Sequence, residues 1–160
     1  TFLHADVALQ MILDLRNHPG GLMAAAGKVV SAFFPLKTTY VAIYSADEKI
    51  EEKTREEPIF PETMRMAVLV NKGSASAAEI VAGALQDLGR ATIVGEPTFG
   101  KGTVQQLLDF TDGSSLKMTI AEWKTPRGNT IDGVGVKPDI QVVADANRDA
   151  ALSRALDLLR

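Results

Sequence analysis

The sequence predicts an α/β fold in which a parallel sheet carries an antiparallel addition. Residues 11–15 and 66–70 are almost continuous apolar runs, and each is followed by a glycine-containing turn and a segment with helical periodicity. Strands of this kind are typical of parallel sheets covered on both faces, with right-handed crossovers. After residue 103 polar and apolar residues alternate, which is typical of antiparallel strands.

The first half of the chain supplies two helices and a further strand. Residues 22–34 carry apolar side chains at helical spacing, and residues 38–44 predict a strand. The densely charged residues 47–57 are expected to form a solvated loop or hairpin. A second helix is predicted from about residue 76 to 88, because Gly89 then stands where glycine commonly ends a helix.

The second half begins with a short strand at residues 91–94 and a glycine-rich loop at residues 95–102. A hairpin turn is expected at residues 111–114, with residues 116–123 as the strand that follows it. Residues 145–160 predict a closing helix.

The composition indicates a globular protein with one domain, residues 1–160. Of its residues 46 % are hydrophobic and 23 % are charged, and its formal net charge of −3 gives no reason to expect a nucleic-acid partner. No apolar run approaches the roughly 18 residues of a membrane span. The absence of cysteine excludes thiol chemistry and disulfides. Since the chain starts at Thr1, we expect a piece of a longer protein, and residues 4–10 carry no assignable pattern.

Ser76 is the first candidate for chemistry. With Glu79 it forms the Ser-x-x-Glu pattern of a capping box, which is a purely structural role. A serine at a helix start also lies where the positive end of the helix dipole and free N–H groups stabilise an oxyanion, and the N–H of Ala77 would be one donor. The residues themselves leave both roles open.

A nucleophilic serine needs a base, and the chain offers two kinds. The histidines His4 and His18 are one option, and Lys101, between two glycines with Phe99 nearby, is the other. A lysine acts as a base only where apolar burial disfavours its ammonium form, and an exposed loop lysine would be inert. Gln105 shares a face with Lys101 in either a helix or a strand, so its amide could aim the amine.

Two other functions are weighed against this pair. Residues 95–101 read Gly-x-x-x-x-Gly-Lys, which is most of a phosphate-binding loop, but Gly102 stands where that motif requires Ser or Thr. Nucleotide binding is therefore disfavoured. The acids Asp14, Glu79 and Asp87 form no metal-binding pattern with histidine, so neither a metal nor a cofactor is expected.

Three stretches together resemble the carboxyl-terminal processing peptidases, also called tail-specific proteases. They are residues 14–21 (DLRNHPGG), 73–80 (GSASAAEI) and 95–102 (GEPTFGKG), and residues 125–128 and 135–139 fit as well. The resemblance extends from about residue 10 to 143. It implies a crotonase/ClpP-like ββα core with a parallel sheet plus an antiparallel addition.

The resemblance also implies an activity, that of a serine endopeptidase with a Ser–Lys dyad. It would cleave proteins near unstructured, apolar C-terminal tails through an acyl-enzyme. Ser76 would be the nucleophile and Lys101 the general base, with Gln105 orienting the lysine. The backbone N–H groups of Gly20 and Ala77 would form the oxyanion hole.

Supporting residues follow from the same resemblance. Glu79 and Asp87 match acids of the motif region, and Asp14 and Arg16 would brace the loop beside the site. His18 stands where the family usually has asparagine, so a local change in the oxyanion loop is expected.

The resemblance bears on the whole protein as well. We expect this chain to be a catalytic core that lacks the family's PDZ domain and N-terminal helical region. A catalytically weak core that binds peptides or hydrophobic ligands is the alternative. The expected partners are protein substrates with exposed C-termini, without nucleic acid or an integral membrane segment, and a homo-oligomer is left open. The expected location is the periplasm or another extracytoplasmic compartment.

Overall fold

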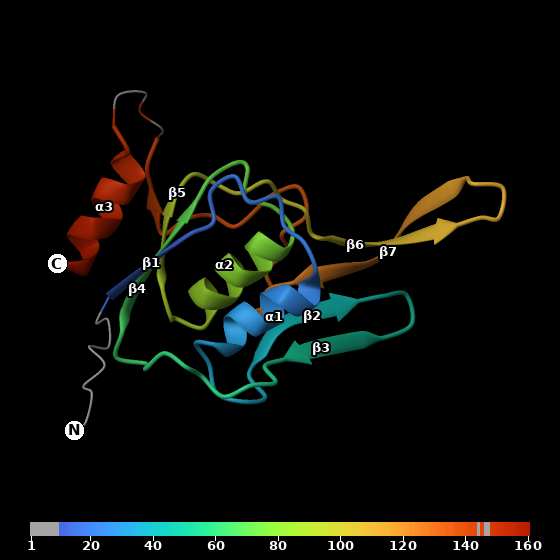
Figure 1. Cartoon of the computed structure of the whole chain (residues 1–160), viewed down its shortest axis with the longest axis horizontal. Coiled ribbons are helices and arrows are strands. Elements are labelled where there is room, and N and C mark those ends of the chain that lie inside the picture. Colours follow the sequence, from blue (N-terminus) through green and yellow to red (C-terminus); the bar gives the residue numbers. More distant parts are fainter. Residues whose placement is uncertain (1–9, 144, 146–147) are drawn as a thin grey trace, which may run out of the picture.

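Two four-stranded sheets form the framework of the computed structural model, which describes residues 10–143, 145 and 148–160 (Figure 1). The first sheet is parallel, with the strand order β1 (Gln10–Asp14), β4 (Arg65–Val70), β5 (Thr92–Gly95) and β8 (Ile140–Gln141). The second is antiparallel, with the order β3 (Lys49–Lys53), β2 (Thr39–Tyr44), β7 (Ser115–Lys124) and β6 (Thr103–Asp109). The predicted α/β class, with its antiparallel addition, is confirmed.

Strand β4 buries both of its faces, as its continuous apolar sequence predicts. One face packs in the larger core with α1 (Met23–Ser31) and α2 (Ala77–Asp87), and the other packs in a smaller core with α3 (Ala150–Leu159). The larger core takes Met66, Val68 and Val70, and the smaller core takes Ala67 and Leu69 together with Ala155 and Leu159.

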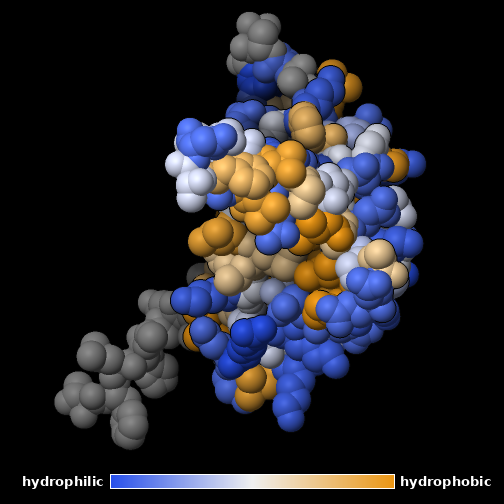
Figure 2. All heavy atoms as spheres, turned by 90° about the vertical axis from the view of Figure 1, so that its right-hand side faces the viewer, coloured by the Kyte–Doolittle hydropathy of each residue, from blue (hydrophilic) through white to orange (hydrophobic). Residues whose placement is uncertain are grey.

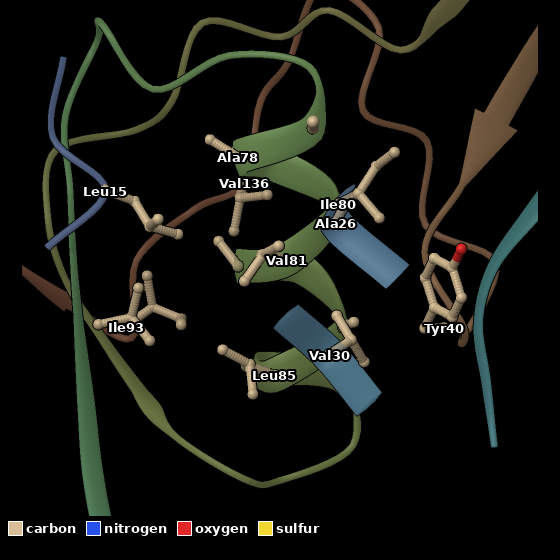
Figure 3. Close-up of a cluster of buried hydrophobic side chains, with 14 of the residues drawn as sticks. Leu15, Ala26, Val30, Tyr40, Ala78, Ile80, Val81, Leu85, Ile93 and Val136 are labelled. Carbon is tan, nitrogen blue, oxygen red and sulfur yellow. The ribbon is translucent and has the colours of Figure 1, made fainter. Parts of the chain in front are cut away.

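Helices α1 and α2 lie between the two sheets. Figure 3 shows α2 with Leu15 and Ile93 on the side of the parallel sheet and with Tyr40 of β2 on the opposite side. The layers therefore run from α3 through the parallel sheet and the helix pair to the antiparallel sheet (Figure 1). Among the described residues, no helix has the length and apolar character needed to cross a bilayer.

Two hairpins extend from this body. The charged segment 47–57 contains β3, which pairs with β2, so the hairpin alternative for this segment is correct. The β6–β7 hairpin projects beyond the core (Figure 1), and Figure 2, which faces it, shows apolar side chains on its surface. Its exposed large apolar residues are Leu107, Phe110, Leu116, Met118 and Ile120.

Several features differ from the sequence predictions, among them the end of α1, which lies at Ser31 rather than at residue 34. Leu22 is the N-cap of α1 and is 78 % exposed, so its predicted place on the apolar stripe is wrong. The closing helix begins at Ala150 rather than at residue 145, because the Asp149 side chain accepts the Leu152 N–H and caps it. Strand β8, which pairs with β5, is not among the predicted strands. His4 lies outside the described residues.

Candidate active site

Ser76 begins α2 in a backbone conformation that few residues other than glycine adopt, with φ 54° and ψ −117°. Such a conformation costs on the order of 1–3 kcal/mol and persists only where its surroundings enforce it. The preceding residue is fixed, because the Ala75 N–H donates to the His18 carbonyl at 3.0 Å. The helix start is closed by the backbone itself, since the Glu79 N–H donates to the Ser76 carbonyl at 2.8 Å.

The Glu79 carboxylate joins the helix start to the loop that carries the lysine. It is 0 % exposed, and its Oε1 accepts the Thr98 hydroxyl at 2.5 Å and the Gly100 N–H at 2.7 Å. Its Oε2 accepts the Ser76 N–H at 2.7 Å and the Lys101 N–H at 2.9 Å. Nucleophile and base candidates, 25 positions apart in the chain, are therefore both held by one oxygen atom. Sequence reasoning assigns Glu79 only a supporting role and misses Thr98.

The loop is also held from its other side. The Trp123 indole Nε1–H donates to the Lys101 carbonyl at 3.1 Å, and the Trp123 N–H donates to the Gly102 carbonyl at 2.8 Å. The Gly102 N–H donates to Asp132 Oδ1 at 3.1 Å. Neither Trp123 nor Asp132 is among the predicted site residues, because nothing in their local sequence marks them.

Ser76, Ala77, Lys101 and Gln105 line one pocket of about 360 Å³. Two segments that are distant in sequence, residues 76–77 and 101–105, thus contribute the predicted residues to a single cavity. The rest of the lining is mainly apolar and consists of Gly21, Leu22, Met23, Ile80, Thr103, Val104, Lys117 and Trp123. An apolar side chain of a bound peptide would be accommodated by this wall.

Phe99 does not shield the lysine. Its side chain is 66 % exposed and does not line the pocket, while its N–H donates to the Ser74 carbonyl at 2.9 Å. Apolar surroundings for Lys101 come instead from Val104 and Trp123, which line the same pocket.

Gly20 packs directly against the candidate nucleophile. With φ 100° it has a backbone conformation that favours glycine, and a Cβ atom there would lie 2.7 Å from Ser76 Cβ and 3.0 Å from the Ala77 nitrogen. The two predicted oxyanion donors, Gly20 and Ala77, are therefore neighbours beside Ser76. The Gly20 N–H donates to His18 Nδ1 at 3.1 Å.

The loop that carries Gly20 is braced by Arg16. The guanidinium makes ion pairs with Asp14 at 2.6 Å and with Asp149, at the start of α3, at 2.8 Å. The hydrogen bond from Arg16 holds the pKa of Asp14 below its ordinary value, and Asp14 in turn raises the pKa of Arg16. Asp149 is missing from the predicted residues, although an acid just before a helix is a recognisable cap.

Asp87, the other acid of the motif region, is the last residue of α2 and holds the turn that contains Arg127 and Asn129. It is buried, and it accepts the Arg127 N–H at 2.9 Å and the Asn129 amide at 3.1 Å. It does not line the pocket of Ser76. Within the described ranges, no three His, Cys, Asp or Glu side chains are grouped so that they could hold a metal ion.

The fold and this site define a class. The mixed α/β core, with a serine at a strained helix start and a lysine loop whose N–H shares an acceptor with that serine, supports the class of serine-type peptidases. The sequence matches Peptidase family S41 over residues 3–142, and the chain belongs to that family. The resemblance to the carboxyl-terminal processing peptidases is thereby confirmed.

Curated relatives carry the corresponding names. A probable CtpA-like serine protease of Staphylococcus epidermidis is 41 % identical over 140 residues, which is 87 % of this chain and 28 % of the relative. A probable CtpA-like serine protease of Staphylococcus haemolyticus is 40 % identical over 142 residues, which is 88 % of this chain and 29 % of the relative. The chain thus spans less than a third of the length of these relatives.

Solved structures agree on the fold. The photosystem II D1 C-terminal processing protease superposes with a TM-score of 0.79 at 34 % identity, over 95 % of this chain and 39 % of that protein. The tricorn protease superposes with a TM-score of 0.62 at 13 % identity, over 94 % of this chain and 15 % of that protein, which shows a shared fold alone.

Proposed function

We propose that this chain is the catalytic core of a serine endopeptidase that uses a Ser76–Lys101 dyad. The observation that carries the proposal is the shared acceptor, because the Ser76 and Lys101 N–H groups both donate to Glu79 Oε2, at 2.7 and 2.9 Å. It is supported by the pocket that both residues line and by the relatives that are named serine proteases.

The first half of the proposed reaction forms an acyl-enzyme. The neutral Lys101 amine takes the proton of the Ser76 hydroxyl as its oxygen attacks the scissile carbonyl. The N–H groups of Gly20 and Ala77 stabilise the resulting oxyanion, and removing one such donor typically costs about 3–4 kcal/mol of transition-state stabilisation. Gln105, which lines the same pocket, aims the amine.

The second half releases the two products. Lys101, now an ammonium, gives its proton to the leaving amine as the carbon–nitrogen bond breaks. A water molecule then attacks the acyl-enzyme, with Lys101 again accepting a proton, and Ser76 is regenerated. Apolar contacts to Ile80, Val104 and Trp123 would hold a substrate side chain during both steps.

The substrate and the location are parts of the same proposal. The apolar pocket wall supports a substrate that ends in an unstructured, apolar C-terminal tail, and the solved relative is named a C-terminal processing protease. Such an enzyme would work in the periplasm or an equivalent compartment. Fractionation of cells that express the full-length protein tests the location.

Purified full-length protein should cleave an unstructured protein with an apolar C-terminus. Ser76→Ala and Lys101→Ala should each lower turnover by at least about 10³-fold, because each removes a group that acts in the transition state. The measurements are turnover of a fluorogenic peptide and covalent labelling of Ser76 by a fluorophosphonate probe.

Lys117→Ala is the matched control, because Lys117 lines the same pocket but has no role in the proposed proton transfer. Its turnover number should stay within about threefold of the wild type. Full turnover in Ser76→Ala or Lys101→Ala would refute the dyad. Peptide binding without cleavage in the wild type would favour the alternative of a binding module.

A further inference from the structure

The N–H group of Gly20 already has an acceptor. It donates to His18 Nδ1 at 3.1 Å, within the same loop. The backbone of His18 is fixed at both of its polar groups, because its N–H donates to the Leu15 carbonyl at 3.2 Å and its carbonyl accepts the Ala75 N–H at 3.0 Å. The imidazole is exposed to solvent.

This hydrogen bond competes with the role that Gly20 has in the proposed function. The Gly20 Cα atom lies against Ser76, where a Cβ would come within 2.7 Å of Ser76 Cβ. In the proposed function, the oxyanion formed at Ser76 accepts the Gly20 N–H. One N–H group makes one strong, well-aligned hydrogen bond, so His18 Nδ1 and the oxyanion cannot both use it fully.

We propose that His18 is a positioning residue that withholds the Gly20 N–H from the oxyanion while Nδ1 is unprotonated. Protonation of the imidazole releases the donor, because an imidazolium carries hydrogens on both ring nitrogens and accepts no hydrogen bond. The inference rests on the proposed function, since it gives Gly20 its importance. It predicts that His18 withholds the Gly20 N–H from the oxyanion more at high pH than at low pH, so that this hydrogen bond slows Ser76 more at high pH.

The direction follows from the chemistry of imidazole. Histidine is the side chain that changes its charge between about pH 5 and 8. While the imidazole is neutral, Nδ1 accepts the Gly20 N–H; once the ring is protonated, the donor is free and a cation stands near the oxyanion. The segments around this loop also carry charged groups, which are Asp14, Arg16, Lys72, Glu79, Glu96, Lys101 and Asp149.

Two substitutions distinguish the effect of accepting the Gly20 N–H from the effect of a change in the protonation state of the side chain at position 18. His18→Ala removes the acceptor at every pH. His18→Asn keeps an acceptor in the same place, because Asn Oδ1 is as many bonds from the backbone as His Nδ1, but it does not titrate. Gly20, Ser76 and Lys101 are unchanged in both variants.

The experiment measures the rate of Ser76 labelling by a fluorophosphonate probe between pH 5 and 8.5 in full-length protein. At pH 8 His18→Ala should react about two- to tenfold faster than the wild type, the factor equivalent to one net hydrogen bond. This ratio should fall to one or below at pH 5. The ratio of His18→Ala to His18→Asn should not change with pH, because neither side chain titrates.

A second readout does not depend on activity. In a Ser76→Ala background, the Gly20 amide resonance in an ¹H–¹⁵N NMR spectrum should titrate with the His18 ring, and it should stay fixed in His18→Asn. The inference is overturned if His18→Ala is no faster than the wild type at pH 8, if the ratio is independent of pH, or if the Gly20 resonance does not titrate. Failure of the proposed function would show itself separately, as a wild type that neither cleaves peptide nor reacts with the probe.

Discussion

At the scale of single residues, the site depends on one buried carboxylate. Glu79 accepts four hydrogen bonds, and the donors are the N–H groups of Ser76, Gly100 and Lys101 and the Thr98 hydroxyl. A carboxylate is suited to this place because it only accepts hydrogen bonds when ionised, whereas an amide presents two donors. The strained backbone of Ser76 is kept in place partly through this residue.

Glu79→Gln tests that dependence. Its amide NH₂ would replace one acceptor oxygen, and at least one buried N–H or O–H donor would lose its partner. An unsatisfied buried group costs about 1–3 kcal/mol, so the free energy of unfolding should fall by that amount and turnover should fall with it. Chemical denaturation and peptide turnover measure the two effects.

Glu62→Gln makes the same chemical change at an exposed position and should alter stability by less than about 0.5 kcal/mol. If Glu79→Gln were as stable and as active as Glu62→Gln, the carboxylate would not be what holds the site together.

At the scale of elements, the site forms where the two sheets meet. Helix α2 leaves the parallel sheet after β4, and the Lys101 loop connects β5 of the parallel sheet to β6 of the antiparallel sheet. The loop passes close to the segment 131–136, with the Gly133 N–H donating to the Gly100 carbonyl at 2.9 Å. Close approach of two backbones explains the glycine at position 100.

Gly100→Ala should disrupt this contact. Gly100 has φ 88°, and an added Cβ would lie 2.9 Å from the Val134 nitrogen, so the loop must shift. Stability should fall by more than about 1 kcal/mol, and peptide turnover should fall because Lys101 moves with the loop.

Gly128→Ala is the control, since Gly128 has a similar φ of 86° but nothing within 4 Å of an added Cβ. It should show only the backbone cost of about 1–2 kcal/mol and should keep its turnover number. Equal losses of activity in the two variants would show that the loop contact is unimportant.

At the scale of the whole molecule, Arg16 links the two ends of the described chain. It joins Asp14, at the end of β1, to Asp149, at the start of α3. The hydrogen bond from Arg16 lowers the pKa of Asp14, and the Leu152 N–H, followed by Arg16, lowers the pKa of Asp149. A carboxylate whose pKa is lowered by folding stabilises the folded state. This stabilisation is fully present above the pKa of the group in the unfolded chain, and it is lost as pH falls through its lower pKa in the folded protein.

Asp14→Asn should therefore lower the free energy of unfolding only at pH values where Asp14 of the wild type is ionised. At pH 7 its free energy of unfolding should be lower than that of the wild type by at most about 1 kcal/mol, because the pair is partly exposed. The difference should start to shrink as pH falls below the ordinary aspartate pKa of about 3.9 and should vanish once the pH lies below the lowered pKa of folded Asp14. Urea denaturation at several pH values measures it, with the exposed Asp47→Asn as the control. A difference that does not shrink with falling pH would contradict the linkage.

Much of this fold could be predicted because its signals are local. Continuous apolar residues in β4 require burial on both faces, and alternation after residue 103 requires a sheet with one exposed face. Strand β8 could not be predicted, because two residues give no period and its pairing with β5 depends on tertiary contact. The start of the closing helix was misplaced because the Asp149 cap overrides the periodicity before it.

The candidate site likewise has a part that could be predicted from local sequence and a part that could not. Ser76, Lys101, Gly20 and Ala77 stand in motifs, Gln105 follows four residues after Lys101, and the structure places all five in or beside one pocket. Their catalytic roles remain predictions. The contacts that fix them, such as the Trp123 indole on the Lys101 carbonyl, come from distant segments and leave no local pattern.

The shared oxygen of Glu79 has a dynamic consequence. Because one oxygen accepts N–H groups from both segments, thermal displacement of the helix start should carry the lysine loop along, so that the motions of the two segments are correlated. Their separation should then fluctuate less than the position of either segment in the molecule.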